Sequence, residues 1–323
     1  MKTKSAVGQV SAPAKVKAPG KGDSIVKRFW KTRFLFLLWL PALVYFIMFK
    51  YVPMYGISIA FFDYNAFSGW EGASWRGLYH FEVFFKSPDF WKITRNTLAL
   101  GLQNLLIGFP VTVLFALLLN EIRNAKFKKI VQTVSYMPHF LSVVVVCGLV
   151  TSLLDPVSGA VNLLIKMFGG NAIPFMTDVN WYRPVYLISA LWQTIGWGTI
   201  VYLAAISGVD PALYEAARLD GAGRWRQMWS ITLPAIAPTV ATMLILRVGN
   251  IMDGSLEKTL LLANGINSEV SDVIVSYVYT KGLSGRQDFS FATAVGLFSN
   301  SINLVLLLVA NTLSKKLADS SIF

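Results

Sequence analysis

Six apolar runs constrain the fold of this chain more than any other feature. A helix needs about 20 mostly apolar residues to cross a bilayer, and the runs lie at 34–57, 97–119, 131–154, 185–207, 234–252 and 291–313. The composition agrees, because 54% of the residues are hydrophobic, only 14% are charged and the mean hydropathy is +0.54. The sequence therefore predicts an all-α integral membrane protein with about six transmembrane helices.

The basic residues of the short loops predict how these helices are oriented. With six spans, one side carries the N-terminal tail, the loop after the second span, the loop after the fourth and the C-terminus. These regions hold Lys2, Lys4, Lys15, Lys17, Lys21, Lys27, Arg28, Lys31 and Arg33; Arg123, Lys126, Lys128 and Lys129; Arg218, Arg224 and Arg226; and Lys315 and Lys316. We expect that side to be cytoplasmic, with both termini inside. The net charge of +12 then reflects this pattern and attraction to anionic lipid, without a nucleic acid partner.

The chain divides into a long membrane domain and two short tails. Residues 1–30 are predicted to form a basic, disordered tail, because the stretch to about Gly22 is polar or small and lacks periodicity. Residues 31–317 form the transmembrane domain, and residues 318–323 a short second tail. A secretory signal peptide is disfavoured, since the first apolar run is too long and starts too late.

Residues 208–234, between the fourth and fifth spans, form a polar loop with its own short helices. Asp210 is a favourable helix N-cap, and Pro211 suits the first helical position. Gly221 and Gly223 then end that helix. A second short helix follows, with Trp225, Met228 and Trp229 on one face. Such an element is expected to lie against the membrane and to present a docking surface.

The same loop carries a multi-part motif. Glu215-Ala216-Ala217 precedes Asp220-Gly221-Ala222, and Leu233-Pro234 follows about a dozen residues later. The pattern resembles the signature cytoplasmic loop of the membrane subunits of binding-protein-dependent ABC importers, most of all in the sugar-importer branch. The resemblance implies a coupling helix that sits in a groove on an ATP-hydrolysing subunit. Glu215 would accept a charge-assisted hydrogen bond there, while Leu213, Ala216, Ala217 and Leu219 would pack in the groove.

Other segments between about residues 30 and 315 look like the same family. They lie at 49–56, 60–64, 96–98, 136–140 and 155–162, and are similar to segments of importers of oligo- or polysaccharides. An alginate importer is the most specific hypothesis. The resemblance implies helices that line a cavity completed by a second, similar permease subunit. It also implies two ATP-hydrolysing subunits, an extracytoplasmic solute-binding protein and a place in the bacterial cytoplasmic membrane.

The chain shows no catalytic residues of its own. Cys147 is the only cysteine, which excludes an intramolecular disulfide and disfavours a cysteine-based metal site. His80 and His139 are the only histidines, and His139 fits a helix start better than a proton relay. We expect no catalytic residue, metal or cofactor in this chain, and ATP with Mg²⁺ to be used by the partner ATPase.

One short motif is a decoy. Leu283-Ser284-Gly285-Arg286-Gln287 resembles an ATPase signature. In an ATPase that signature must accompany a phosphate-binding Gly-x-x-x-x-Gly-Lys-Ser/Thr loop, and the sequence contains none. The pentapeptide is therefore interpreted as a coincidence.

Polar side chains at mid-membrane depth are the candidates for the substrate path, because they are costly unless they face a cavity or a partner. In the fourth span, Gln193, Gly196 and Trp197 share one helical face, with Trp192 adjacent. Trp192, Gln193 and Trp197 match cavity positions in the family's maltose importer. Aromatic rings pack on sugar C–H faces and amides bond hydroxyls. Packing or interfacial anchoring is the alternative role for the two tryptophans.

The fifth and sixth spans add further candidates. Arg247, Asn250, Gly254 and Glu257 form one polar stripe if the helix continues, with Asp253 off that stripe. Arg247 would pair with Glu257 or a neighbouring helix, or bind the carboxylate of an acidic sugar; a snorkelling role is equally open. The sixth span contributes Ser299, Asn300 and Asn303, either to the path or to interhelical hydrogen bonds.

Two other functional classes remain open. One is the same kind of subunit for another solute, such as an amino acid or phosphate. The other is a stand-alone secondary transporter, which predicts inverted repeats and ionisable residues for ion coupling. No obvious repeat is present, and Arg247 is the main mid-span charge. An integral-membrane enzyme is less favoured, because no catalytic set appears.

Overall fold

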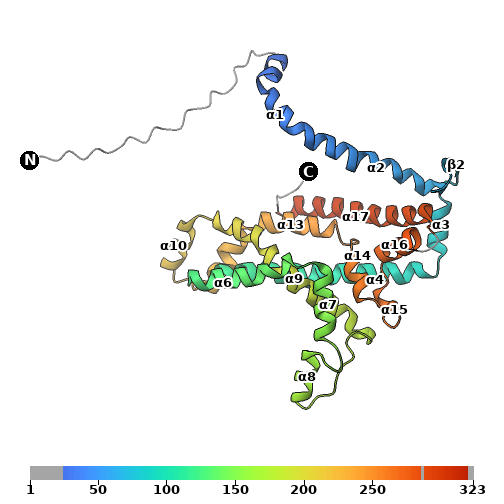
Figure 1. Ribbon diagram of the computed structural model, residues 1–323. Helices are drawn as coiled ribbons and strands as arrows, with labels where there is room; N and C mark the ends of the chain where they lie inside the picture. The colour runs from blue at the N-terminus through green and yellow to red at the C-terminus, as the bar shows by residue number, and fades with distance from the viewer. Residues whose placement is uncertain (1–24, 285–286, 319–323) are drawn as a thin grey trace, which may run out of the picture. The chain divides into compact units, whose positions relative to one another are not determined.

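The computed structural model describes residues 25–284 and 287–318, in which helices dominate (Figure 1). Most of the two predicted tails, at residues 1–24 and 319–323, lies outside the described residues. The chain divides into two units, Met1–Gly56 and Ile57–Phe323.

The first unit consists of helical segments that continue past its boundary. α1 (Ile25–Phe46) is followed by the π-helical turn η1 (Ile47–Tyr51), by α2 (Val52–Met54) and by the 3₁₀ helix η2 (Tyr55–Phe61). The stretch Leu37–Phe61 is long and apolar enough to cross a membrane, which agrees with the span predicted at 34–57. α1 begins at Ile25, inside the stretch that the sequence analysis assigned to the basic tail.

A small hairpin opens the second unit. β1 (Phe62–Asn65) pairs antiparallel with β2 (Gly69–Trp75), and Phe62 lies opposite Trp75. The rings of that pair meet edge-on with centroids 5.0 Å apart. Gly69 has a φ of 60°, which an L side chain rarely adopts. This hairpin is not predicted from the sequence, because its two strands are short and follow an apolar run directly.

The other elements of the second unit are helical. They are α3 (Tyr79–Lys86), α4 (Asp89–Gln103), η3 (Asn104–Gly108), α5 (Phe109–Asn120), α6 (Ala125–Tyr136), η4 (Met137–Phe140), α7 (Val143–Leu153), α8 (Ala160–Met167), α9 (Val179–Ser207), α10 (Pro211–Leu219), α11 (Arg224–Gln227), η5 (Met228–Thr232), α12 (Leu233–Ala235), α13 (Ala237–Val248), α14 (Leu256–Leu262), α15 (Ser268–Ser271), α16 (Ile274–Tyr279), η6 (Thr280–Ser284) and α17 (Phe289–Ala318).

Three stretches of this unit are each long and apolar enough to cross a membrane. They are Asp89–Asn120, Val179–Ser207 and Phe289–Lys315. They confirm the spans predicted at 97–119, 185–207 and 291–313. The first contains the π-helical turn η3 just before Pro110, a residue that cannot donate a backbone hydrogen bond.

The spans predicted at 131–154 and 234–252 are not single straight helices. Ala125–Phe140 and Val143–Leu153 meet at 103°, so α7 turns away from α6 (Figure 1). Pro138 lies in the 3₁₀ helix η4 at this bend. Ser142 then starts α7, because its hydroxyl accepts a hydrogen bond from the backbone of Val145 at 3.3 Å.

The second bend lies between α12 and α13. Arg224–Ala235 and Ala237–Val248 meet at 65°. Ile236 leaves the helical region with φ −93° and ψ 2°, and Pro238 has no N–H to continue the ladder. Apolar composition alone cannot reveal either bend, because the apolar run continues through both.

Buried apolar side chains join these helices through three separate clusters. α9 packs against α5 and α6, and α13 lies beside α17 (Figure 1). Gly196 makes the α9–α6 approach possible, since a Cβ there would lie 2.1 Å from the carbonyl oxygen of Ser135. Tyr202, Met228 and Ile236 belong to a buried cluster that joins α9 to η5 and the bend before α13.

Candidate coupling helix and polar cavity

α10 begins as the sequence predicts. Asp210 is its N-cap, and the side chain accepts a hydrogen bond from the backbone N–H of Ala212 at 2.9 Å. Pro211 occupies the first helical position, where the missing N–H has no intrahelical partner to lose.

α10 also ends as predicted, at Gly221. The N–H of Ala222 donates to Ala217 at 2.8 Å, and the N–H of Gly221 donates to Arg218 at 3.1 Å. This pair of bonds is a Schellman motif, and it places Gly221 at a φ of 74°. A residue with a Cβ is disfavoured in that conformation.

Side-chain contacts of α10 and of the segment that follows it hold this loop against the membrane helices. Tyr214 and Thr232 share a hydrogen bond of 3.0 Å between their hydroxyls. Arg224 forms an ion pair of 3.0 Å with Glu121 and also donates to the Glu121 backbone carbonyl. Gln227 donates to the carbonyl of Ala222 at 2.7 Å. Tyr214 therefore joins α10 to η5, and Arg224 joins the following helix, α11, to the end of α5.

Trp225, Met228 and Trp229 do not share the one helical face that the sequence predicts. Met228 is buried in the core, whereas Trp225 and Trp229 are exposed. The prediction was wrong for Met228, because the π-helical turn η5 changes the angular spacing of the helix at that residue.

The outer face of α10 combines apolar, small and acidic side chains. Leu213 is 50% exposed and Leu219 is 90% exposed. Glu215, Ala216 and Asp220 are exposed, and Ala217 is half-buried. Within the described residues Glu215 forms no hydrogen bond or ion pair. This face is therefore free to meet another surface.

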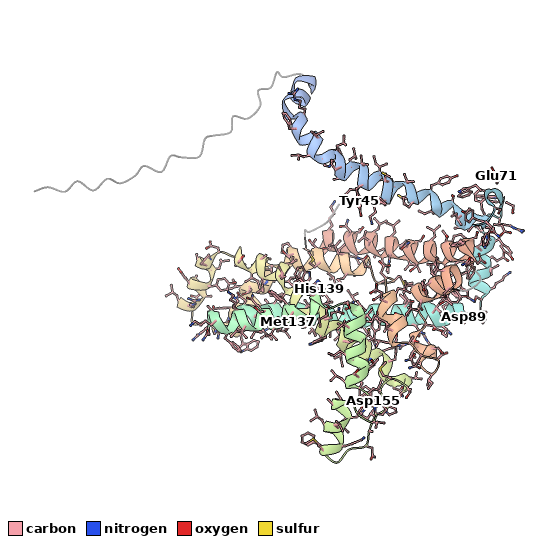
Figure 2. The ribbon with its side chains drawn as sticks, viewed as in Figure 1. Tyr45, Glu71, Asp89, Met137, His139 and Asp155 are labelled. Atoms are coloured by element: carbon pink, nitrogen blue, oxygen red, sulfur yellow. The ribbon has the colours of Figure 1, made fainter. Side chains whose placement is uncertain are left out.

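The three candidates on α9 do not converge on one site. Gln193 is buried, and its amide donates to the carbonyl of Leu141 at 3.1 Å. Trp197 stacks on His139 with ring centroids 4.5 Å apart. Figure 2 labels His139 and Met137 where the chain passes from α6 to α7. Trp192 instead lines an apolar cavity of about 410 Å³ beside Ile188.

A separate polar cavity of about 190 Å³ lies between α4, η3, α9 and the turn after α13. Its polar lining residues are Thr97, Asn104, Tyr186, Arg247, Asn250 and Asp253. Two sequence candidates, Arg247 and Asn250, therefore share one cavity. Gly101 allows the turn to approach α4, because a Cβ there would lie 2.0 Å from the carbonyl oxygen of Ile251.

The continuous polar stripe expected from Arg247 to Glu257 is not formed. α13 ends at Val248, and Asn250 bonds back to the carbonyl of Arg247 in a tight turn at 3.2 Å. Glu257 lies on the separate helix α14 and is exposed. The helix stops because Gly249 and the turn that follows divert the backbone.

The side chain of Asn303, on α17, stabilises the turn after α13. Its side-chain oxygen accepts the N–H of Met252 at 2.9 Å, and its amide donates to Asp253 at 2.8 Å. These bonds confirm the interhelical alternative for Asn303. Asn300 is exposed and lines a different cavity, of about 470 Å³, beside Tyr279.

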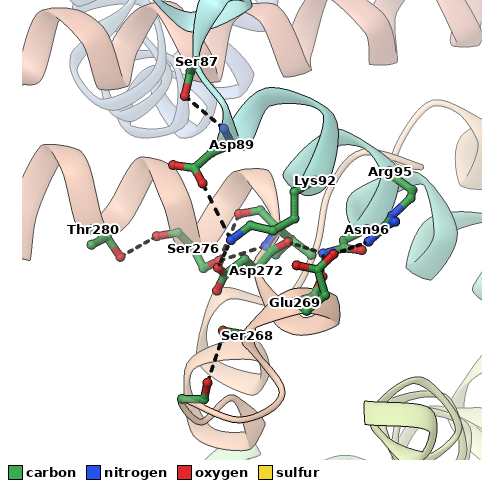
Figure 3. A network of polar contacts seen from close by, with 12 residues as sticks. Ser87, Asp89, Lys92, Arg95, Asn96, Ser268, Glu269, Asp272, Ser276 and Thr280 are labelled. Atoms are coloured by element: carbon green, nitrogen blue, oxygen red, sulfur yellow. Dashed lines mark hydrogen bonds and ion pairs between the residues drawn. The ribbon is translucent and has the colours of Figure 1, made fainter.

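A polar network that the sequence analysis missed ties α4 to the segment around α15 (Figure 3). Lys92 lies 2.8 Å from Asp272 and 3.7 Å from Asp89, and Arg95 lies 2.9 Å from Glu269. The buried amide of Asn96 completes it.

Asn96 connects three elements through both ends of its amide. Its nitrogen donates to the carbonyls of Glu269 at 2.8 Å and Asp272 at 3.0 Å. Its oxygen accepts from Arg183 on α9 at 3.0 Å. Lys92 and Arg95 pair with Asp272 and Glu269, which are distant in the chain, so no short motif reveals these contacts.

The cysteine and the histidines do not form a catalytic or metal site within the described residues. Cys147 is buried and free, and no group of three His, Cys, Asp or Glu side chains there could hold a metal ion. His80 is buried, with Nε2 at 3.1 Å from the carbonyl of Phe62. Of the decoy pentapeptide, Gly285 and Arg286 lie outside the described residues.

Known proteins match both the sequence and the fold. A family described as "Binding-protein-dependent transport system inner membrane component" matches residues 108–319. The polygalacturonan/rhamnogalacturonan transport system permease protein YteP of Bacillus subtilis is 50% identical over 291 residues, which cover 90% of each chain. Protein LplB of Bacillus subtilis is 41% identical over 317 residues, covering 97% of this chain and 99% of that one.

A solved structure agrees with this fold. It is the crystal structure of a bacterial ABC transporter involved in the import of the acidic polysaccharide alginate. One of its chains matches with a TM-score of 0.83 and 40% identity, covering 91% of this chain and 99% of that one. A second crystal structure shows a bacterial alginate ABC transporter in complex with an alginate pentasaccharide-bound periplasmic protein. One of its chains matches with 38% identity and a TM-score of 0.83, covering 92% of this chain and 99% of that one.

Proposed function

Since the chain belongs to the family of binding-protein-dependent transport system inner membrane components, as a permease of a sugar or polysaccharide importer, we propose that its own substrate is an acidic saccharide. Family membership sets aside the stand-alone secondary transporter and the integral-membrane enzyme. The relatives also favour a saccharide over an amino acid or phosphate. The names of two of them refer to the transport of uronate polymers, polygalacturonan in one case and alginate in the other.

The position of Arg247 carries the proposal for an acidic substrate. Its side chain lines the polar cavity beside Asn250 and Tyr186. No ion pair of Arg247 occurs within the described residues, and the nearby Asp253 carboxylate is engaged by Asn303. A guanidinium binds a carboxylate through two parallel hydrogen bonds, and amides and phenols bond sugar hydroxyls. The cavity therefore suits one uronate unit of a longer chain.

The remaining candidates take supporting roles in this proposal. Trp192 and Trp197 are exposed at the surface of α9, where a second permease subunit or a sugar ring would reach them. Asn300 and Glu257 are exposed and lie outside the polar cavity. Gln193 and Asn303 are assigned to positioning the backbone around the bends, because both are buried, their amides bond the backbone there and neither lines the polar cavity.

α10 is proposed to transmit the work of ATP hydrolysis. Its exposed Leu213, Ala216 and Leu219 fit a groove on an ATP-hydrolysing subunit, and Glu215 is free to accept a bond from a basic residue there. ATP and Mg²⁺ are assigned to two such partner subunits, and this chain binds no cofactor. Tyr214 joins α10 to η5, and Arg224 of α11 pairs with Glu121 at the end of α5, so movement of this loop would pass to both.

The orientation follows from the placement of the basic loops. The end of the bundle that carries α10, together with both termini, is assigned to the cytoplasm. The opposite end is assigned to the docking of an extracytoplasmic solute-binding protein, which hands over the saccharide. A second permease subunit of the same kind completes the path within the lipid bilayer.

A purification from membranes tests this function. The tagged chain is isolated in mild detergent, and ATP hydrolysis by the eluate is measured with binding proteins and a panel of neutral and acidic oligosaccharides. The proposal predicts an ATPase and a second permease subunit in the eluate, with hydrolysis stimulated by an oligouronate. Stimulation by neutral saccharides alone would refute the acidic substrate and leave the importer assignment intact.

A further inference from the structure

A lysine on α14 is buried without a counter-ion. Lys258 is only 3% exposed, and its Nζ has no hydrogen-bond partner in the described part of the chain. The ammonium makes a cation–π contact, with Nζ 5.4 Å from the centroid of the Tyr186 ring. Such a contact replaces little of the hydration that a buried ammonium loses.

Two further hydrogen-bond donors beside Lys258 are also unsatisfied. Tyr182 and Thr259 are buried, and neither hydroxyl has a partner among the described residues. The Thr259 hydroxyl lies near the hydroxyls of Tyr182 and Tyr186 without forming a hydrogen bond to either. An ammonium and two hydroxyls without partners therefore lie close together where α14 packs on α9. Buried donors normally have partners, so this set indicates a missing acceptor.

The missing acceptor is an anion rather than a neutral group. Burial lowers the pKa of Lys258 to about 8, so the amine stays largely protonated near neutral pH. The acidic side chains nearby in sequence or space do not neutralise it. Asp272 pairs with Lys92 at 2.8 Å, Asp253 accepts from Asn303 at 2.8 Å, and Glu257 is exposed. A carboxylate would satisfy the charge and the hydroxyls together.

Tyr186 separates Lys258 from the polar cavity. Its ring lies under the Lys258 ammonium, and the same residue lines the cavity that holds Arg247 and Asn250. Its hydroxyl accepts the N–H of Ser255, the N-cap of α14, at 3.3 Å. A turn of Tyr186 away from α14 would join the two regions.

We propose that Lys258, with Tyr182 and Thr259, forms a second carboxylate-binding subsite that a uronate unit reaches when Tyr186 turns away from α14. This inference rests on the proposed acidic substrate and adds a residue that the sequence pattern did not single out. A polymer of uronates carries a carboxylate on every sugar, so two cationic subsites, Arg247 and Lys258, would bind successive units.

The test compares an acidic probe with its neutral counterpart. The complete importer is reconstituted in proteoliposomes with its binding protein, and uptake of trigalacturonate and of its methyl ester is measured against concentration. Lys258→Met should raise the half-saturating concentration of trigalacturonate about tenfold or more, the usual effect of removing a charged hydrogen-bond partner. Uptake of the ester and hydrolysis of ATP without substrate should not change. Lys281→Met is the matched control, because Lys281 makes a similar contact with Tyr277, at 5.1 Å, but is exposed.

The outcomes separate this inference from the function on which it rests. Wild-type uptake of the ester but not of trigalacturonate would refute the acidic substrate and the subsite together. Normal trigalacturonate uptake by Lys258→Met would overturn the subsite alone, as would equal losses for both probes, which indicate a structural role. If Lys258→Met fails to assemble, Tyr182→Phe removes one donor at almost constant volume. A loss confined to trigalacturonate is again expected, and unchanged uptake would overturn the subsite.

Discussion

The indole of Trp197 lies flat on the imidazole of His139, with ring centroids 4.5 Å apart and planes 7° apart. His139 belongs to η4, at the bend between α6 and α7, and Trp197 lies in the middle of α9. The amide of Gln193 bonds the carbonyl of Leu141 in the same region, at 3.1 Å. Together these contacts hold the bend against α9. They give Gln193 and Trp197 a structural role that needs no contact with substrate.

Replacing Trp197 should therefore loosen the bend before it alters selectivity. Trp197→Ala is expected to lower the stability of the assembled importer by about 1–2 kcal/mol, because the stacked ring pair and part of its buried area are lost. Trp197→Phe should recover most of the loss. Thermal unfolding of the purified complex checks this. A normal unfolding temperature with a changed preference for trigalacturonate over its ester would instead assign Trp197 to the substrate path.

The close approach of α9 and α6 predicts a severe effect at Gly196. A methyl group there would lie 2.1 Å from the Ser135 carbonyl oxygen, which is backbone and cannot rotate away. Gly196→Ala should cost about 1–3 kcal/mol or prevent assembly. Gly148→Ala is the control, since nothing lies within 4 Å of its added Cβ and α7 is helical there. Equal yields of the two variants after detergent extraction would show that the helices do not meet as described.

The coupling helix predicts a separation of transport from folding. The exposed side chain of Glu215 forms no hydrogen bond or ion pair within the described residues, so Glu215→Lys should leave membrane insertion and thermal stability unchanged. Uptake should fall by at least about tenfold, as expected when a charged hydrogen bond becomes a repulsion. Glu71→Lys, an exposed charge reversal on β2, serves as control. Uptake of Glu215→Lys at the wild-type rate would remove this residue from the coupling surface.

Gly221 tests the shape of the same helix. Its φ of 74° makes Gly221→Ala strained by about 1 kcal/mol, and Gly221→Pro impossible without unwinding the end of α10. Basal ATP hydrolysis should persist in Gly221→Pro, while stimulation by substrate is lost. Retained stimulation would mean that the end of α10 does not contribute to coupling.

The buried ammonium of Lys258 predicts a pH dependence of stability. Burial lowers the pKa of Lys258 from the usual 10.5 to about 8 in the folded protein. Below pH 8 the amine is protonated in both states, and the full cost of burying its charge is present. Between pH 8 and 10.5 the unfolded chain binds more protons than the folded one, so the folded state gains stability as pH rises.

The gain is on the order of 3 kcal/mol across that window. The unfolding temperatures of the wild-type complex and of Lys258→Met, measured without substrate from pH 7 to about pH 10, check it. The difference between them separates Lys258, together with the nearby Cys147 thiol whose charge acts on it, from the other groups that titrate. The wild type should become more stable relative to the variant as pH rises. A difference that stays constant with pH would mean that the ammonium is solvated or paired.

The features that the sequence predicted are those encoded by neighbouring residues. Asp210, Pro211 and Gly221 define the start and end of α10 through local backbone chemistry, and the structure contains each cap. The straight spans followed from unbroken apolar runs. Local rules suffice in these places because the interacting groups are only a few residues apart.

The features that the sequence did not predict depend on distant contacts. Ser142 and Ile236 mark bends inside apolar runs, where hydropathy has no signal. The turn after α13 exists because Asn303 bonds Met252 and Asp253 from another helix. Lys258 follows Glu257 in the chain, and nothing in that pair indicates which side chain is buried. Tertiary packing decides it.

The most direct test of the account concerns Arg247. Uptake of labelled trigalacturonate and of its methyl ester is measured in proteoliposomes that contain the complete importer with wild-type chain or Arg247→Gln. The account predicts that the wild type favours the acid, and that Arg247→Gln loses about tenfold or more for the acid with little change for the ester. Equal uptake of the acid by both proteins would contradict the assignment of the polar cavity as the carboxylate-binding part of the path.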